Sequence, residues 1–363
     1  MTRKLIVLLV VLLAAGFKVA AQEVKNQPPI LAQRSNKWYA VSPIDGSATV
    51  LVEPAEGEKL LPLQENNLSS DGQWLAYGTF KYDKVLKASR YSLYLMNLST
   101  RTVESINPSG GIFDRPVPAT HTFQIFDLTW SYDGTRLYYV RMENENGERT
   151  VAVAGQLAYY DMGKRNHHLV ARLDPALVVD EVTPLPNGVV LRSIEGGSDT
   201  AVMSLYAANN AVVNVSKLAN VYSRPLRLVD QFYFLEISDN QSTTLFDVET
   251  GESQTVEEKY HPAFRSQVTG DQSLRLFRIF DHGGKWLVYS SDGKTLIQTL
   301  PDKMGSRIAV SPDGQAIAYV AYAKPGVGKI QVMDSDRTMR ELPFDAELIV
   351  WGAVEGELFA VNR

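Results

Sequence analysis

A ten-residue pattern that recurs three times constrains the fold of this chain more than any other feature of its sequence. Its clear copies occupy residues 68–77, 130–139 and 310–319, and each contains Ser-x-Asp-Gly followed by apolar and tyrosine residues. The aspartate side chain bonds its own backbone two residues on, and glycine takes a positive φ without a steric clash, so Asp-Gly marks a tight turn. Aromatic and aliphatic residues after the turn favour a half-buried strand. The pattern therefore predicts strand, turn and strand.

Weaker copies of the same turn continue along the chain. Taking the clear and weak copies together, the turns fall at positions 71, 133, 187, 230, 271, 313 and 355, and from 187 onward they are 41–43 residues apart. A second series of turns lies midway, near positions 45, 99, 163, 209, 250, 292 and 335. Two hairpins in about 42 residues make a four-stranded unit, which is typical of a β-propeller blade.

These repeats predict an all-β protein, a β-propeller of seven four-stranded blades. The chain begins with the second hairpin of a unit, residues 38–52, and ends with the first hairpin of one, residues 347–361. We therefore expect the N- and C-terminal strands to share one blade, which leaves no exposed sheet edge. One alternative stays open, because residues 29–35 could form an extra strand that competes with residues 357–361 for the same place.

The first 21 residues have the sequence pattern of a signal peptide. Arg3 and Lys4 precede an apolar run that ends before Lys18, and small residues stand at the −3 and −1 positions of a cut before Gln22. The apolar run is shorter than the roughly 20 residues needed to span a bilayer. We expect residues 1–21 to be removed and residues 22–363 to form a single propeller domain, which is periplasmic or secreted.

The composition excludes several function classes. The chain has 36 basic and 41 acidic residues, and three of the basic ones lie in the leader, which leaves 33 against 41 and a net charge of −8. A net acidic protein binds nucleic acids and anionic membranes poorly, so we expect no nucleic-acid partner and no membrane insertion after leader cleavage. The absence of cysteine excludes disulfides, thiolate nucleophiles and cysteine-type zinc sites.

The Ser-x-Asp-Gly-x-x-Leu/Ile-Ala/Tyr-Tyr core resembles the WD40-like (PD40) repeats of TolB-type bacterial propellers. The similarity runs from residue 68 to the C-terminus, with three strong copies. It implies a propeller fold and says little about function. The blade-like sequence begins within about 20 residues of the expected cleavage site, where TolB carries an α/β domain. Since the repeat count also departs from the six blades of that family, we expect a relative other than TolB itself, and TolB's lipoprotein partner is not carried over.

Local motifs for catalysis or metal binding are missing. No G-x-S-x-G nucleophile motif occurs. His167 and His168 are adjacent on a predicted strand, so they point to opposite faces and cannot share one ion. Residues 143–148 are rich in oxygen ligands but lack the calcium-loop pattern, so we expect a solvated hairpin tip there. The sequence predicts no catalytic residue, no metal site and no cofactor.

The insertions point to a binding face. In a four-stranded blade, the turns after the first and third strands lie on one face, and the loops after the second and fourth lie on the other. The extra length falls in residues 81–90, 107–124, 143–155 and 323–328, all on the second face, which we call the long-loop face. Long loops on a rigid scaffold often carry binding residues. The candidates combine aromatic and basic groups suited to an extended polar ligand: Tyr82, Lys84, Arg90, Phe113, Arg115, His121, Phe123, Arg141 and Arg149.

Three functions are compatible with these features. The leading hypothesis is a non-catalytic extracytoplasmic propeller that binds a protein, peptide or glycan through the long-loop face. The alternative is a propeller-type enzyme, such as a lyase or glycosidase, whose site is gathered around the central funnel. A third is a structural module of a larger envelope complex. Two facing carboxylates or three clustered histidines in the funnel would favour the enzyme.

Overall fold

Strands account for nearly all of the regular structure in the computed structural model. It describes residues 28–351 except for 70, 109–120, 132, 146–150, 186–187, 196–200, 208–211, 219–223, 228–232, 239–242, 248–252, 257–273, 279–285, 291–295, 300–303, 312–315, 325, 335 and 337. The one helix in this part of the chain is a single 3-10 turn, η1 (Glu65–Asn67). No helix among the described residues is long and apolar enough to cross a membrane.

Strands β1 to β15, together with β27 from near the C-terminal end, form four antiparallel sheets. Sheet 1 contains β27 (Leu348–Trp351), β1 (Ile30–Arg34), β2 (Lys37–Val41) and β3 (Ala48–Val52). Sheet 2 contains β4 (Lys59–Leu60), β5 (Trp74–Asp83), β6 (Ala88–Asn97) and β7 (Val103–Ser105). Sheet 3 contains β8 (His121–Trp130), β9 (Arg136–Glu145), β10 (Val151–Asp161) and β11 (Asn166–Leu173). Sheet 4 contains β12 (Leu177–Leu185), β13 (Gly188–Glu195), β14 (Ala201–Ala207) and β15 (Val212–Leu218).

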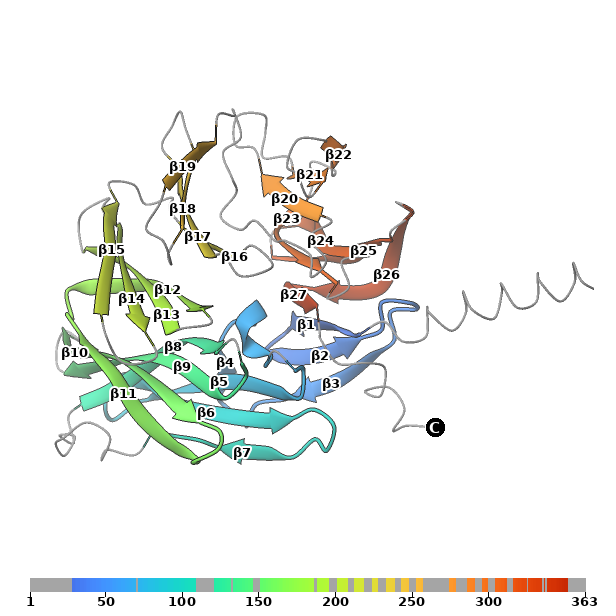
Figure 1. Cartoon of the computed structure of the whole chain (residues 1–363). Coiled ribbons are helices and arrows are strands. Elements are labelled where there is room, and N and C mark those ends of the chain that lie inside the picture. Colours follow the sequence, from blue (N-terminus) through green and yellow to red (C-terminus); the bar gives the residue numbers. More distant parts are fainter. Residues whose placement is uncertain are drawn as a thin grey trace, which may run out of the picture.

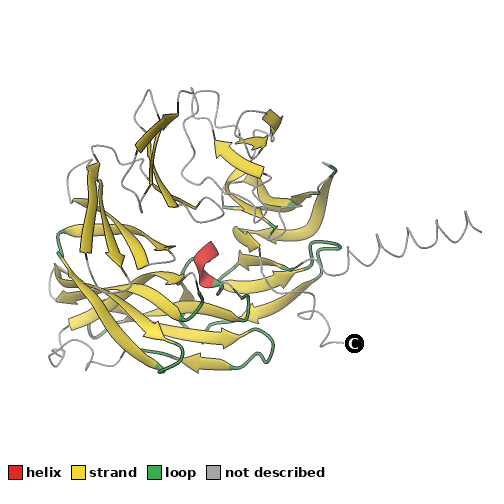
Figure 2. Cartoon of the chain, in the orientation of Figure 1, coloured by secondary structure: helices red, strands yellow, loops and turns green. Residues whose placement is uncertain are grey.

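Three further sheets complete the described structure. Sheet 5 contains β16 (Arg224–Arg227), β17 (Tyr233–Ser238), β18 (Thr243–Asp247) and β19 (Ser253–Val256). Sheet 6 shows β20 (Leu274–Arg278), β21 (Trp286–Ser290) and β22 (Leu296–Thr299). Sheet 7 contains β23 (Met304–Val310), β24 (Ile317–Lys324), β25 (Val327–Met333) and β26 (Met339–Ala346). The sheets follow one another around a common centre (Figure 1), and strands dominate throughout (Figure 2).

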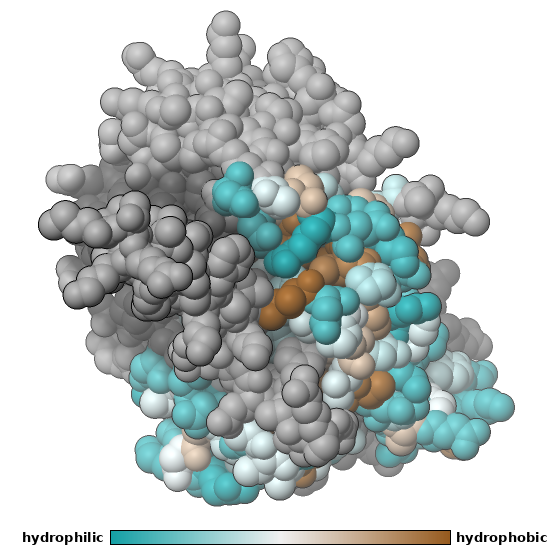
Figure 3. All heavy atoms as spheres, turned by 90° about the vertical axis from the view of Figure 1, so that its right-hand side faces the viewer, coloured by the Kyte–Doolittle hydropathy of each residue, from teal (hydrophilic) through white to brown (hydrophobic). Residues whose placement is uncertain are grey.

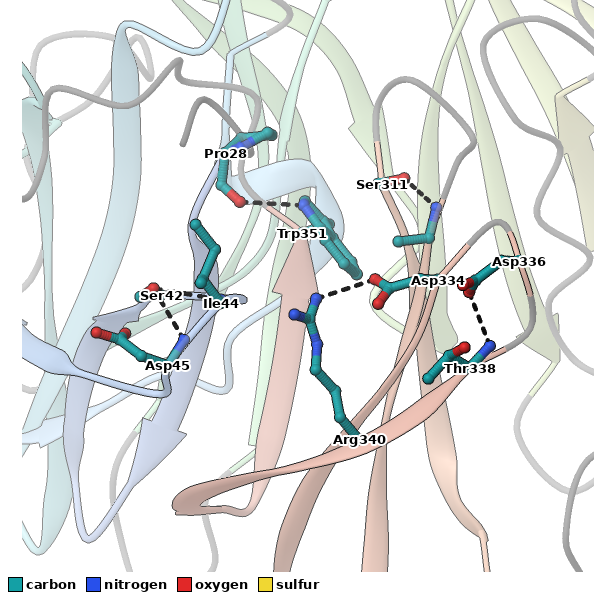
Figure 4. A network of polar contacts seen from close by, with 11 residues as sticks. Pro28, Ser42, Ile44, Asp45, Ser311, Asp334, Asp336, Thr338, Arg340 and Trp351 are labelled. Atoms are coloured by element: carbon teal, nitrogen blue, oxygen red, sulfur yellow. Dashed lines mark hydrogen bonds and ion pairs between the residues drawn. The ribbon is translucent and has the colours of Figure 1, made fainter. Parts of the chain in front are cut away.

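Sheet 1 joins strands from opposite ends of the described chain. β27 pairs antiparallel with β1, with Ile30 opposite Trp351 and Gln33 opposite Leu348. The Trp351 indole Nε1 donates to the Pro28 carbonyl oxygen at 3.2 Å (Figure 4). β1 therefore occupies the place beside β27, as the alternative of an extra strand at residues 29–35 had allowed. Residues 357–361, the other contender for that place, lie outside the described part.

The apolar core is divided into clusters that lie between neighbouring sheets. Because successive side chains of a strand point to opposite faces, each sheet can bury apolar groups on both sides. The described surface in Figure 3 is mainly hydrophilic, with hydrophobic atoms in small areas. Buried residues of the four clusters include Val320 and Ile349 between sheets 7 and 1, Trp38 and Leu75 between 1 and 2, Leu93 and Tyr139 between 2 and 3, and Val140 and Leu191 between 3 and 4.

The polar residues of the repeat motif bond one another inside the turn. The Ser131 hydroxyl donates to Asp133 Oδ1 at 2.6 Å and accepts the backbone N–H of Arg136 at 2.9 Å. The glycine that follows Asp133 has a φ of 69°, as the turn requires. The same serine contact recurs in the turns of residues 69–74 and 311–316 (Figure 4). The motif is thus explained by the turn and marks the fold rather than a ligand site.

His167 and His168 point to opposite faces of β11, as the strand alternation predicts. The His167 ring packs edge-on against Tyr139 and Tyr160, and its Nδ1 lies 2.9 Å from the Tyr139 hydroxyl. The His168 ring stacks on Tyr159 at 5.0 Å. Burial lowers the pKa of His167 to about 4, so this ring is neutral at pH 7.

The partly buried ring of His167 makes stability depend on pH. In the unfolded chain it binds a proton near its ordinary pKa of 6.5, whereas in the folded protein it does so only near 4. The unfolded state is therefore favoured as the pH falls from 6.5 to 4, by no more than about 3 kcal/mol. Urea unfolding at pH 7 and pH 4.5 should show a smaller loss of stability for His167→Gln than for the wild type. His168→Gln is the matched control, and an unchanged loss in His167→Gln would contradict the buried neutral ring.

Removing β27 should open sheet 1. Deletion of residues 347–363 exposes the edge of β1 and uncovers the apolar cluster between sheets 7 and 1. We expect a lower and less cooperative thermal transition by circular dichroism, and aggregation on gel filtration. Val50→Ala, at an exposed position of β3 in the same sheet, is the control and should keep the wild-type transition. A monomeric 347–363 deletion with an unchanged melting curve would refute the structural role of β27.

Candidate functional site

In three of the four insertions on the long-loop face, most of the described residues belong to strands. β5 and β6 stay paired as far as Asp83 and Ala88, so residues 81–90 are two strand ends closed by a four-residue turn. β9 continues to Glu145 and β10 starts at Val151, while β24 and β25 are paired out to Lys324 and Val327. This corrects the expectation of long loops in these three places. The reason is that pairing satisfies the backbone hydrogen-bonding groups of the added residues.

The start of β8 and the end of β9 bring three predicted residues together. The His121 imidazole Nδ1 lies 2.6 Å from Glu143 Oε1. The guanidinium carbon of Arg141 lies 3.2 Å from the centroid of the Phe123 ring. Phe123 stands directly opposite Glu143 in the strand register, which explains why these side chains share one face of sheet 3.

A β-bulge in β8 sets which way these side chains point. The register with β9 shifts between Phe126 and Thr129, and Asp127 takes a left-handed φ of 55°. The extra residue lets Ile125, before the bulge, and Leu128, after it, face the same apolar cluster between sheets 2 and 3. A left-handed non-glycine residue costs on the order of 1 kcal/mol. Because of this bulge, the side chains at the beginning of β8 point toward sheet 2.

The charged groups of this cluster are buried against one another. Arg141 and Glu143 are only 2% and 3% exposed, and the His121 side chain is 12% exposed. Burial lowers the pKa of the Arg141 guanidinium to about 10, while Tyr139 and Glu143 act to raise it, so the group is still charged at pH 7. The aromatic face and the carboxylate compensate a buried cation that would otherwise be costly.

Glu143 and Asn144 correct the expectation of a solvated hairpin tip at residues 143–148. Both belong to β9 and are 3% and 5% exposed, whereas Glu145 is exposed. Residues 146–148 lie outside the described part. Within the part of the chain that the structure describes, no three His, Asp or Glu side chains come close enough to hold a metal ion.

Sheet 2 supplies an aromatic wall on the same side. The rings of Phe80 and Tyr91 stack at 5.6 Å, and Tyr91 packs against the cluster that also contains Ile125 and Tyr139. Both rings are partly exposed, and burial raises the pKa of Tyr91. We call the set Phe80, Tyr91, His121, Phe123, Arg141 and Glu143 the sheet 2–3 junction. Sequence reasoning missed Phe80, Tyr91 and Glu143, although strand alternation could have placed all three beside the predicted residues.

The other candidates lie elsewhere. Tyr82, Lys84 and Arg90 belong to the hairpin that joins β5 to β6, where Arg90 Nε bonds Asp83 Oδ2 at 2.8 Å. Phe113, Arg115 and Arg149 lie outside the described residues. The nine predicted residues therefore divide into a junction group, a hairpin group and a group whose placement is not described.

Comparisons with known proteins identify the fold but not a protein family. No family model and no curated protein matches the chain. Prolyl oligopeptidase B from Galerina marginata aligns with a TM-score of 0.59 at 11% identity, over 90% of this chain and 53% of its own. Oligogalacturonate lyase in complex with manganese aligns with a TM-score of 0.57 at 11% identity, over 86% and 85%. The β-propeller domain of the Trilobed protease from Pyrococcus furiosus gives 0.54 at 11% identity, over 80% and 84%.

At 11% identity these similarities establish fold alone. The chain spans about half the length of prolyl oligopeptidase B. Membership of the TolB-type repeat family stays a prediction, since it rests on the three Ser-x-Asp-Gly copies. The sheet architecture and the aligned propeller domain agree with the fold that those copies predict: the chain is an all-β protein with the β-propeller fold.

Proposed function

We propose that this protein is a non-catalytic, extracytoplasmic propeller of seven blades that binds a protein, peptide or glycan through its long-loop face. The sheet 2–3 junction is the centre of the binding site. The observation that carries the proposal is the convergence of His121, Phe123 and Arg141 beside the aromatic wall of sheet 2.

The junction offers the two kinds of contact that an extended polar ligand needs. Phe80, Tyr91 and Phe123 are partly exposed rings, which supply rigid apolar area for peptide side chains or sugar faces. Glu143 holds Nδ1 of His121, and this contact orients the ring and leaves Nε2 for a ligand. A fixed donor or acceptor beside apolar rings gives orientation as well as affinity.

Three observations support a ring of seven blades. Seven sheets follow one another among the described residues, β27 pairs with β1, and every core cluster described lies between consecutive sheets. Sheet 1 would then be the blade shared by the two ends of the chain. A closed ring protects sheet edges and gives the junction a rigid support.

The extracytoplasmic address rests on the leader at residues 1–21. Cleavage before Gln22 should release a chain whose first residue is that glutamine. Intact-mass measurement of protein recovered from the periplasm or the medium tests this. Recovery only in the membrane pellet, with residues 1–21 retained, would contradict it.

The binding site can be tested with two probes. A phage-displayed random peptide library and a glycan array should each be screened against the immobilised protein. Ligands selected in this way should bind Phe123→Ala at least about tenfold more weakly, because a buried aromatic contact contributes on the order of 1–2 kcal/mol. His121→Ala should weaken the same ligands.

The control variant is Met339→Ala, at the start of β26 on the opposite face, and it should bind as the wild type does. All variants need wild-type melting temperatures for the comparison to count. If no ligand of either class is selected, or if selected ligands bind all variants equally, the proposed site is wrong.

A further inference from the structure

The β5–β6 hairpin extends beyond its own sheet. β4 pairs with β5 as far as Phe80, and β7 pairs with β6 only from Tyr94 to Met96. Among the described residues, positions 82–90 therefore form a two-stranded ribbon with no further strand on either side. The ribbon projects on the long-loop face.

The end of the ribbon is held in one conformation. Asp83 Oδ1 accepts the backbone N–H groups of Val85 at 2.9 Å and Leu86 at 3.1 Å, and Asp83 Oδ2 accepts Arg90 Nε at 2.8 Å. Val85 at the apex is 90% exposed, and Tyr82 below it is 59% exposed. The capped turn keeps this aliphatic side chain in solvent, near the exposed ring of Tyr82, instead of letting it fold back.

The ribbon carries a net positive charge, opposite in sign to that of the whole chain. Residues 81–90 contain four basic side chains and one acid, in a chain whose net charge is −5. Arg90 is paired with Asp83, but within the described structure no carboxylate forms an ion pair with Lys84 or Lys87. The apex therefore combines an exposed aliphatic group with two unneutralised lysines.

We propose that this hairpin docks the protein on an anionic lipid bilayer. Val85 enters the boundary between head groups and acyl chains, Tyr82 lies at the interface, and Lys84 and Lys87 contact the anionic head groups. A protein partner fits less well, because the cores of protein interfaces are depleted in lysine and each partner usually contributes about 800 Å². A single narrow ribbon does not offer such an area.

The acidic total charge disfavours an anionic membrane, as the composition predicts, but its effect is weak at the hairpin itself. Charges separated by more than about 10 Å are largely screened at ordinary salt concentrations, so the residues nearest the bilayer decide the sign of the interaction. The docking is independent of the ligand bound at the sheet 2–3 junction. Either one can fail in experiment without the other.

The absence of cysteine makes a site-specific test possible. Val85→Cys, labelled with an environment-sensitive fluorophore such as NBD, should show a blue-shifted and brighter emission with vesicles of phosphatidylcholine and phosphatidylglycerol. Vesicles of phosphatidylcholine alone should leave it unchanged. The control label is Ile44→Cys, in the turn between β2 and β3 on the opposite face, whose emission should not respond to either vesicle.

A charge reversal tests the electrostatic half of the proposal. Lys84→Glu changes the local charge by two and should lower vesicle co-sedimentation about tenfold or more, with a loss that shrinks as salt is added. Lys164→Glu, an exposed lysine in the β10–β11 turn, is the matched control and should bind as the wild type does. Both lysines lie in exposed turns, so neither substitution should change the thermal transition. An unchanged transition shows that the variants are folded.

Three outcomes would overturn the proposal. They are an equal response of the labels at positions 85 and 44, equal binding to vesicles with and without the anionic lipid, and binding of Lys84→Glu at the wild-type level. Soluble polyglutamate offers a further comparison. If it binds the protein while the label at position 85 stays in a watery environment with anionic vesicles, the hairpin recognises an acidic polymer and not a bilayer.

Discussion

The packing of apolar sheet faces against neighbouring sheets is the interaction on which the rest of this structure depends. No disulfide can hold the chain, since it has no cysteine, so the sheets must be held by burial alone. The four apolar clusters lie between sheets 7 and 1, 1 and 2, 2 and 3, and 3 and 4, so sheets 1, 2 and 3 are covered on both faces. A sheet with two covered faces cannot shift without exposing both, so the strand ends become rigid supports.

The candidate site lies where this apolar packing gives way to polar groups. Along β9, Leu137 and Tyr139 belong to the cluster between sheets 2 and 3, and the next residues on that face are Arg141 and Glu143. A buried cation and carboxylate would destabilise the interface if either stood alone. Their contacts with Phe123 and His121 allow the polar groups to remain inside the edge of the interface, where the His121 side chain keeps 12% exposure.

Local signals predicted the fold well, and non-local pairing explains what they missed. Ser131, Asp133 and the glycine after them form their turn within a few residues, so a short pattern is enough to find it. Residues 81–90 are predicted to be a long loop because they add length to the repeat, yet they are paired strand ends joined by a short turn. The strand beside β27 comes from residues more than 300 positions away, and Glu143 is buried by contacts with other strands. The residues of a turn predict neither the strand that pairs with β27 nor the burial of Glu143.

Carboxylates in the turns of both faces are occupied by the turns themselves. On the turn face, Asp45 accepts the N–H of Ser47, which lowers the pKa of the Asp45 carboxyl. Arg340 donates to Asp334 at 2.9 Å (Figure 4). Those groups stabilise turns and have little left to offer a partner. Lys84 on the long-loop face has no ion pair in the described structure. A propeller must form every turn in order to fold, whereas strands on the long-loop face can lengthen without disturbing a turn, so the fold is compatible with the binding role proposed for that face.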